Sequence, residues 1–375
     1  MQTDMANGSV QPENVRVANR LSLLRSVLES EEFSRADAAH WTQLSVPTVT
    51  SIFQEFSELG IIQSVGFSTN RGGRPAEVFQ PRRDARQVLA ADLSGRVAEA
   101  GKLDLCGELL SLEAGPVISP STAKAVLEWL CDLVSLSDDR LHYIAIAAPG
   151  VIDSSTGRVR LAPSLGWDDF PLASVLEEKT GLRVVIENDV NALTLAQLDL
   201  RDADSVRHLI YLLVTSGGIG AGIVVNRELY RGSRAAAGEV GFSLLGLQDQ
   251  PQKIEFGTAG PLEAALVKEV CAALDAQGRL SVNSPAAERS FERFLAGIQF
   301  LVHNLACALD PDLFLIDWSP DEEGVLAREI GKRWLGPDPI RVEAVRRSSG
   351  SALKGVSRLA LDAIAAEIAL GSRSP

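Results

Sequence analysis

The chain has 375 residues, a formal net charge of −13 at pH 7 and 46% hydrophobic residues. This length exceeds a single ordinary hydrophobic core, so we expect two or three domains. No apolar run is long enough to span a bilayer and the N-terminus lacks the layout of a signal peptide, so we expect a cytoplasmic protein without a membrane partner. The four cysteines are scattered and form no C-x-x-C pair, which argues against a disulfide framework.

Charge is distributed unevenly along the chain. Residues 1–86 carry 9 Arg, no Lys and 10 Asp plus Glu, a net charge of −1, which leaves −12 for the remainder. Five of these arginines lie between residues 71 and 86. An acidic body with a locally basic head is compatible with DNA binding confined to the head.

The head begins with 14 residues that we expect to be disordered and continues with helical patterns. Apolar residues at positions 17, 21, 24 and 28 recur at helical spacing. Ser34 followed by Asp37 is typical of a helix N-cap, and Ser45 is predicted to cap a longer helix that Gly60 ends. The polar residues left outside on this longer helix are Thr48, Thr50, Ser51, Gln54 and Glu55.

A short helix, a tight turn and a longer helix with a polar face form a helix–turn–helix, whose second helix enters the major groove. Segments 61–65 and 76–80 are predicted strands of a hairpin, and its glycine-rich tip carries two arginines suited to phosphate contacts. Residues 15–80 are therefore interpreted as a winged helix–turn–helix domain. The alternative is a helical protein-interaction module with a solvated arginine loop. The predicted DNA contacts are Pro47, Thr48, Thr50, Ser51, Gln54, Arg71 and Arg74.

Residues 81–87 are predicted to be a linker, after which the hydrophobic pattern changes. Segments 88–110 and 210–232 resemble one another, since each contains a strand, a Ser/Gly turn, a second strand and the start of a third. This repeat predicts a duplicated α/β body over 88–375, with two lobes and a ligand cleft between them. The other predicted strands are 142–147, 183–187, 313–316 and 340–344. The predicted helices are 121–136, 172–179, 191–199, 260–277, 284–309, 321–334 and 352–369.

The predicted helix 284–309 is richer in apolar residues than a lone surface helix requires. It is interpreted either as part of a dimer interface or as a buried core helix. The apolar residues behind both interpretations are Phe291, Phe294, Leu295, Ile298, Leu301 and Val302.

Two further patterns predict binding groups in the body. The glycine-rich turn at residues 216–222 lies between two apolar strands, where exposed N–H groups commonly bind phosphate. Asn188 and Asp189 lie where a strand ends and a helix begins, the usual edge for binding groups in a parallel sheet. An aspartate there could accept a proton from a sugar hydroxyl, and the alternative is a simple helix N-cap.

Several short motifs occur in a fixed order along the body. They are 148–150, LAPSLGW, 187–191, 218–222, 230–232, 238–241, and Gly257 with Gly260 and Glu263. On these motifs the body resembles the ROK family of repressors, open reading frames and sugar kinases, which belongs to the actin-like superfamily. This resemblance implies an actin-like α/β fold with a sugar site formed by Asn188, Asp189, Glu239 and Glu263. In the kinases of the family, the residue matching Asp189 is the catalytic base.

The sequence departs from the family at its zinc site, which the resemblance places on one His and three Cys. None of the four matching residues can bind zinc, so we expect no zinc and infer a small hydrophobic cluster instead. These residues are Phe242, Ile254, Phe256 and Pro261.

The sequence also departs from the kinases of the family at three phosphate and nucleotide positions. The first phosphate turn has Ser94 and Arg96 after Asp92, and the second has lost a threonine at Ser216–Gly217. Asp317 and Trp318 replace small residues at the adenosine strand. Because phosphoryl transfer depends on positioning and charge neutralisation, we expect no ATP and no kinase activity, and Asp189 would be a vestigial base position.

The leading hypothesis is a transcriptional regulator whose binding to double-stranded operator DNA responds to a sugar or sugar derivative. Among regulators, a repressor is favoured. It would act as a homodimer or homotetramer. One alternative is an ATP-dependent sugar kinase with a fused DNA-binding head. Another is a DNA-binding protein whose body binds no ligand and serves only for assembly.

Overall fold

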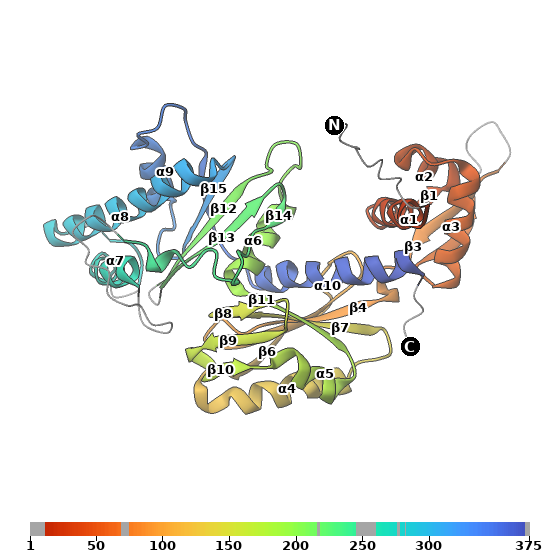
Figure 1. Cartoon of the computed structure of the whole chain (residues 1–375), viewed down its shortest axis with the longest axis horizontal. Coiled ribbons are helices and arrows are strands. Elements are labelled where there is room, and N and C mark those ends of the chain that lie inside the picture. The colour runs from red at the N-terminus through yellow and green to blue at the C-terminus, as the bar shows by residue number, and fades with distance from the viewer. Residues whose placement is uncertain are drawn as a thin grey trace, which may run out of the picture.

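The computed structural model describes residues 12–68, 75–215, 218–244, 260–275, 278–281 and 283–371. Figure 1 shows a small head beside a body of two lobes, with the last helix, α10 (Ser351–Leu370), lying between the head and the body. None of the helices in these ranges is both long and apolar enough to cross a membrane.

The head consists of three helices and a small antiparallel sheet of order β1-β3-β2. Both predicted caps are present, since the hydroxyls of Ser34 and Ser45 accept hydrogen bonds from the third residues of their helices. Three aromatic rings, of Phe33, Phe53 and Phe79, pack against one another in its core. The elements are α1 (Pro12–Leu28), β1 (Phe33–Ser34), α2 (Arg35–Thr42), α3 (Val46–Glu58), β2 (Ile62–Phe67) and β3 (Glu77–Pro81).

The boundaries of the head differ from the predicted ones. Helix α1 begins at Pro12 rather than at residue 15, because proline suits the first turn of a helix. The predicted linker is a short helical turn, Arg83–Ala85, that is held from both sides. The N–H of Arg82 donates to the Ile61 carbonyl at 2.7 Å, and the N–H of Leu105 donates to the Arg83 carbonyl at 2.9 Å. Strand β4 then starts at Gln87.

The two lobes contain five-stranded sheets with the same topology, β6-β5-β4-β7-β11 and β14-β13-β12-β15-β16. In each lobe three strands form an antiparallel meander, and two further strands add in parallel beside the first. The internal repeat seen in the sequence therefore corresponds to a repeated topology. The strands of lobe I are β4 (Gln87–Asp92), β5 (Val97–Leu103), β6 (Glu113–Val117), β7 (Leu141–Ala148) and β11 (Arg183–Asn188). Those of lobe II are β12 (Leu209–Thr215), β13 (Gly218–Val225), β14 (Glu228–Leu229), β15 (Leu313–Trp318) and β16 (Val342–Val345).

Helices cover these sheets, and one small sheet was not predicted. The helices are α4 (Ala123–Ser135), α5 (Leu172–Thr180), α6 (Asp189–Asp199), α7 (Pro261–Ala272), α8 (Pro285–Leu309) and α9 (Val325–Lys332). The unpredicted sheet comprises β8 (Val151–Asp153), β9 (Arg158–Ala162) and β10 (Trp167–Phe170). Its strands are too short to show a clear alternation of polar and apolar residues.

Helix α8 belongs to the core of lobe II. All six apolar side chains that suggested a dimer interface are buried within the single chain, where they pack against the sheet and α7. The interface interpretation of these side chains is therefore wrong, and the core-helix interpretation is confirmed. Helix α8 needs apolar side chains around much of its circumference because other elements cover it on several sides.

Helix α6 connects the two lobes and is packed unusually closely on both sides. A Cβ atom added at Gly355 of α10 would lie 1.8 Å from the Ala192 carbonyl oxygen of α6. A Cβ at Gly222 of β13 would lie 1.8 Å from Oγ1 of Thr194. Only glycine allows these approaches, so α6 is held between lobe II and α10.

Replacing Gly355 by Ala should destabilise the protein by at least about 1–3 kcal/mol, because the added methyl group overlaps backbone on α6. Urea unfolding of the purified variant measures the change. The matched control is Gly331→Ala in α9, where a Cβ would meet nothing within 4 Å. A Gly355→Ala protein as stable as the control would show that α6 and α10 are not in this close contact.

Candidate functional site

Two carboxylates meet at the ends of strands β4 and β11 in lobe I. Asp92 ends β4, and its Oδ1 accepts hydrogen bonds from the Ser94 hydroxyl at 2.7 Å and the Ser94 N–H at 2.9 Å. Asp189 begins α6 and is half-buried. Burial raises the pKa of the Asp189 carboxyl from 3.8 to about 7, and the nearby negative charge of Asp92 adds to the shift. Asp189 can therefore accept or release a proton near neutral pH.

Asn188 caps α6. Its Oδ1 accepts hydrogen bonds from the N–H groups of Val190 at 2.9 Å and Asn191 at 3.1 Å. Its Nδ2 donates to the carbonyl of Gly150 at 2.9 Å. The alternative reading of Asn188 as an N-cap is thus confirmed. The cap occupies the amide oxygen, which leaves the second N–H of Nδ2 as the part of this side chain that could donate to a ligand.

The glycine-rich stretch has a different role from the predicted turn. Residues Gly218–Val225 form strand β13, while 216–217 lie outside the described residues. Gly220 and Gly222 face α6, where Cβ atoms would lie 3.0 Å from Val190 and 1.8 Å from Thr194. The prediction of a glycine turn over 218–222 is therefore wrong. These residues belong to a strand, and their glycines leave space for the neighbouring helix α6.

The other two predicted sugar contacts lie beside the start of β13. The carboxylate of Glu263, in the first turn of α7, occupies a niche that exists because two neighbours are glycines. A Cβ at Gly218 would lie 2.9 Å from its Oε1, and one at Gly241 would lie 3.0 Å from its Oε2. Glu239 is its neighbour, since burial raises the pKa of the Glu239 carboxyl and the charge of Glu263 adds to the shift. Gly218, Gly220 and Gly222 alternate with bulkier residues along β13, so Glu263 and helix α6 lie against the same face of that strand.

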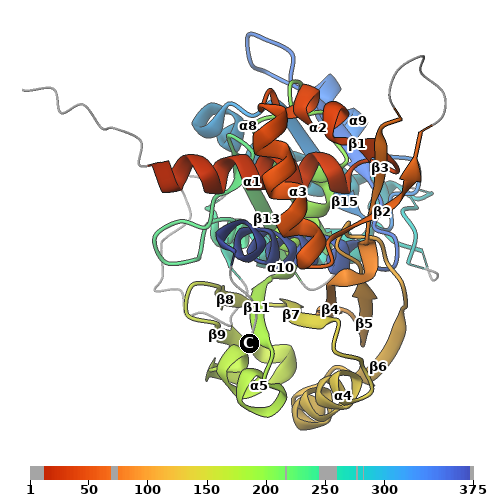
Figure 2. The ribbon, with the colours of Figure 1, turned by 90° about the vertical axis from the view of Figure 1, so that its right-hand side faces the viewer.

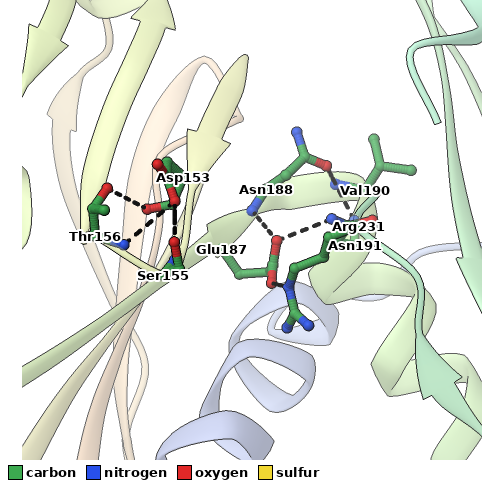
Figure 3. A network of polar contacts seen from close by, with 8 residues as sticks. All are labelled: Asp153, Ser155, Thr156, Glu187, Asn188, Val190, Asn191 and Arg231. Carbon is green, nitrogen blue, oxygen red and sulfur yellow. Dashed lines mark hydrogen bonds and ion pairs between the residues drawn. The ribbon is translucent and has the colours of Figure 1, made fainter. Parts of the chain in front are cut away.

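The structure adds two residues that were not predicted as site residues, Glu187 and Arg231. Figure 3 shows Glu187 at the end of β11, facing Arg231 from lobe II. The Nε of Arg231 donates to Oε2 of Glu187 at 2.7 Å. The sequence feature that could have identified Glu187 is a charged residue at the end of an apolar stretch of strand.

Asp317 and Trp318, which end strand β15, are buried in lobe II. Asp317 accepts a hydrogen bond from the Tyr211 hydroxyl and pairs with Nε of Arg347 at 2.8 Å. The ring of Trp318 packs on Phe294 with ring centroids 4.7 Å apart. That these two residues replace small ones at a nucleotide position stays a prediction.

The residues matching the zinc ligands of the family are only partly described. Phe242 lies in a short helical turn and Pro261 begins α7, while residues 254 and 256 lie outside the described ranges. Neither phenylalanine nor proline offers a side-chain donor atom, so this set does not fit zinc. Across the described ranges, no group of three or more His, Cys, Asp and Glu residues could hold a metal ion.

In the head, helix α3 lies away from lobe II (Figures 1 and 2), and it exposes a stripe of polar side chains. The exposed members are Pro47, Thr50, Ser51 and Gln54. Thr48 is half-buried, and its hydroxyl lies 2.8 Å from that of the capping Ser45. Glu55 was predicted on this face but turns toward α1, where it pairs with Arg16 at 2.7 Å and with Arg20. Arg71 and Arg74 lie outside the described residues.

A hollow of about 600 Å³ lies between α3 and the β2–β3 hairpin. Thr50 and Gln54 line it from the helix, and Arg35 and Arg82 bring positive charge to its walls. The guanidinium group of Arg35 lies over the ring of Phe79, 4.6 Å from its centroid, and is held by Glu77 at 2.7 Å. The hollow therefore has a mixed polar and apolar lining, in which Glu77 balances the charge of Arg35, and it is adjacent to the exposed stripe.

The family model described as the ROK family matches residues 88–315. The chain belongs to the ROK family. A ROK relative, the Xylose repressor of Caldicellulosiruptor bescii, is 30% identical over 238 residues, covering 62% of this chain and 59% of that relative. The Glucokinase of Halalkalibacterium halodurans is 32% identical over 165 residues, covering 42% of this chain and 49% of that protein. The chain therefore spans less than two thirds of the length of both relatives.

A solved structure described as a ROK family transcriptional regulator, homolog of the E. coli MLC protein, aligns with a TM-score of 0.73 at 19% sequence identity. The alignment covers 95% of this chain and 98% of that one. The likeness shows a shared fold for almost the whole chain, and this range includes most of the head as well as the ROK body.

The raised pKa of Asp189 predicts a pH dependence of stability. Between pH 3.8 and about 7 the folded protein retains a proton that the unfolded chain has released. The stability that this proton contributes is therefore fully present below pH 3.8 and is lost as the pH rises toward 7. Asp189→Asn cannot titrate, so the difference in unfolding free energy between the two proteins should change over this window. Parallel curves from urea unfolding would contradict the shifted pKa.

Proposed function

We propose that this protein is a sugar-responsive transcriptional regulator, and specifically a repressor. The observation that supports the proposal is the combination of a head with an exposed polar helix and a ROK body that carries polar side chains at all four positions where the family resemblance implies sugar contacts. The name of the Caldicellulosiruptor bescii relative, a repressor, supports the same function.

The head is proposed to be a winged helix–turn–helix domain that binds operator DNA. Support comes from the two capped helices, from the solvent-facing stripe on α3, and from the hairpin that follows it. In this arrangement α3 enters the major groove, and the hairpin with Arg71 and Arg74 contacts the phosphate backbone. The hollow between α3 and the hairpin, with Arg82 in its wall, would face the same duplex. A homodimer or homotetramer would present two such heads to a palindromic operator.

The body is proposed to bind a sugar through Asn188, Asp189, Glu239 and Glu263. The carboxylates of Asp189, Glu239 and Glu263 can accept hydrogen bonds from several hydroxyls of one sugar, and the free N–H of Asn188 can donate one. A neutral polyol suits this site better than an anion, because the carboxylates repel negative charge. Sugar binding affects the operator only through a difference in affinity between two arrangements of the protein.

A sugar kinase with a fused DNA-binding head is a second candidate, supported by the pairing of Asp92 with Asp189. A carboxyl with a pKa of about 7 is well suited to accept a proton from a sugar hydroxyl. Against this, Oδ1 of Asp92 already accepts two hydrogen bonds from Ser94. We propose sensing rather than phosphoryl transfer.

Replacing Gln54 by Ala should weaken binding to a selected operator by about 1–3 kcal/mol, because the amide is exposed on the stripe proposed to read base edges. Fluorescence anisotropy with a duplex selected from a random library measures the affinity. Gln80→Ala is the matched control, since Gln80 is bonded to Glu32 and does not line the hollow. Equal losses in both variants would argue against α3 as the recognition helix.

A thermal-shift screen should identify at least one neutral pentose or hexose that raises the melting temperature, because binding to the native state stabilises it. Glu239→Gln should lower that shift. If no sugar moves the melting temperature, the remaining interpretation is a body that serves only for assembly.

The same panel incubated with ATP and Mg²⁺ should yield no sugar phosphate. Chromatography with radiolabelled ATP is sensitive enough to detect slow turnover. Sugar phosphate formed by the wild-type protein and absent with Asp189→Asn would establish the kinase instead.

A further inference from the structure

The Glu187–Arg231 ion pair joins the two lobes directly beside the proposed sugar contacts. Glu187 belongs to β11 of lobe I, and Arg231 follows β14 of lobe II. Their side chains meet at 2.7 Å, as Figure 3 shows. The pair is 44 residues apart in sequence and therefore reflects how the lobes are placed, not local chain geometry.

Glu187 is buried, with 1% of its side chain exposed, while Arg231 is 35% exposed. Both carboxylate oxygens of Glu187 are used. Oε2 accepts from Arg231, and Oε1 accepts from Nδ2 of Asn191 and from the N–H of Asn188, both at 2.9 Å. A buried carboxylate that loses its cationic partner is strongly unfavourable. The structure around Glu187 therefore depends on an arginine supplied by the other lobe.

In lobe I, the Glu187–Arg231 ion pair is hydrogen-bonded to the segment that carries two of the proposed sugar contacts. Oε1 of Glu187 binds the backbone N–H of Asn188, and Asn188 in turn caps α6 at Asp189. A shift of Glu187 would move the end of β11 and the first turn of α6 together, because these groups share one network of hydrogen bonds.

On the lobe II side, Arg231 begins the segment that ends at Glu239. The carbonyl of Arg231 accepts from the N–H of Ala237 at 3.1 Å, which closes the segment into a compact loop. The carbonyl of Gly238 accepts from the N–H of Ala221 at 2.8 Å, which attaches the loop to β13. Arg231 therefore connects the junction of β11 and α6, at Asn188 and Asp189, to the loop that carries Glu239.

We infer that Glu187 and Arg231 are positioning residues that clamp the two lobes and set the spacing of the sugar contacts. Neither is assigned a contact with the sugar. The clamp holds Asn188 and Asp189 of lobe I at a fixed distance from Glu239 of lobe II, so a sugar that needs both sides meets a preformed site. This inference rests on the proposed sugar site for its effect on affinity, while the clamp itself can be tested without a sugar.

The test combines ligand binding with hydrogen exchange on the full-length protein. Arg231→Gln and Glu187→Gln each remove one partner, and the double variant removes both without leaving a buried charge. D-xylose and D-glucose are the calorimetric probes. Each single variant should bind the recognised sugar about tenfold or more weakly, and the double variant should bind no more weakly than the singles, because the pair acts as a unit.

Hydrogen exchange should show the effect of each substitution across the lobe boundary. Arg231→Gln in lobe II should accelerate exchange in the peptide 183–191 of lobe I, and Glu187→Gln should accelerate exchange in 229–239 of lobe II. Arg231→Lys keeps the charge and should restore much of the protection against exchange. It replaces Arg231→Gln in the experiment if that variant folds poorly.

The matched control is Arg333→Gln, which breaks an ion pair of 2.7 Å to Glu292 within lobe II and should alter neither sugar affinity nor exchange at 183–191. Exchange that accelerates only on the substituted side, together with unchanged sugar affinity, would overturn the clamp. If the wild-type protein binds neither sugar, the choice of these sugars fails, and the exchange across the lobes alone decides whether the clamp exists.

Discussion

The arrangement of the body depends on the close packing of α6 between β13 and α10. Gly222 and Gly355 remove the side chains that would keep these elements apart, so the helix that joins the lobes has little freedom to shift. Its first residue, Asp189, is therefore placed by contacts with both lobes. A phosphate-binding role for these glycines is not needed to explain them, since van der Waals contact with a helix already excludes a larger residue.

The same packing accounts for the electrostatics of the site. Asp92 and Asp189 come from separate segments, yet the lobe I sheet brings them to one edge, where burial and the like charge of Asp92 raise the pKa of Asp189. Glu239 and Glu263 form a second pair of carboxylates, in which burial and the charge of Glu263 raise the pKa of Glu239. Carboxylates gathered in this way repel one another. A ligand that donates several hydrogen bonds would relieve part of that repulsion, which favours a polyol as the effector.

Local features of this fold were predictable from sequence, and long-range ones were not. The caps at Ser34 and Ser45, the repeated strands and the Asn188 corner follow from short motifs whose physical reasons are local. The partner of Glu187 lies on another lobe, so no spacing rule could identify it. The partners of Asp317 were not predictable for the same reason, because a family motif gives a position along the chain but not the side chains that bury it. The tip of the hairpin, with Arg71 and Arg74, remains a prediction.

Arg20 connects two helices of the head to the last helix of the body. Arg20 of α1 pairs with Glu55 of α3 and donates a hydrogen bond to the carbonyl of Ala369 in α10 at 2.9 Å. The hydrophobic core is continuous across the same boundary, from the head through α10 to lobe I. The head and lobe I therefore share one hydrophobic core. In the proposed mode of DNA binding, substitutions on the exposed face of α3 would leave this core intact, because Glu55 on the other side of the helix holds it to α1.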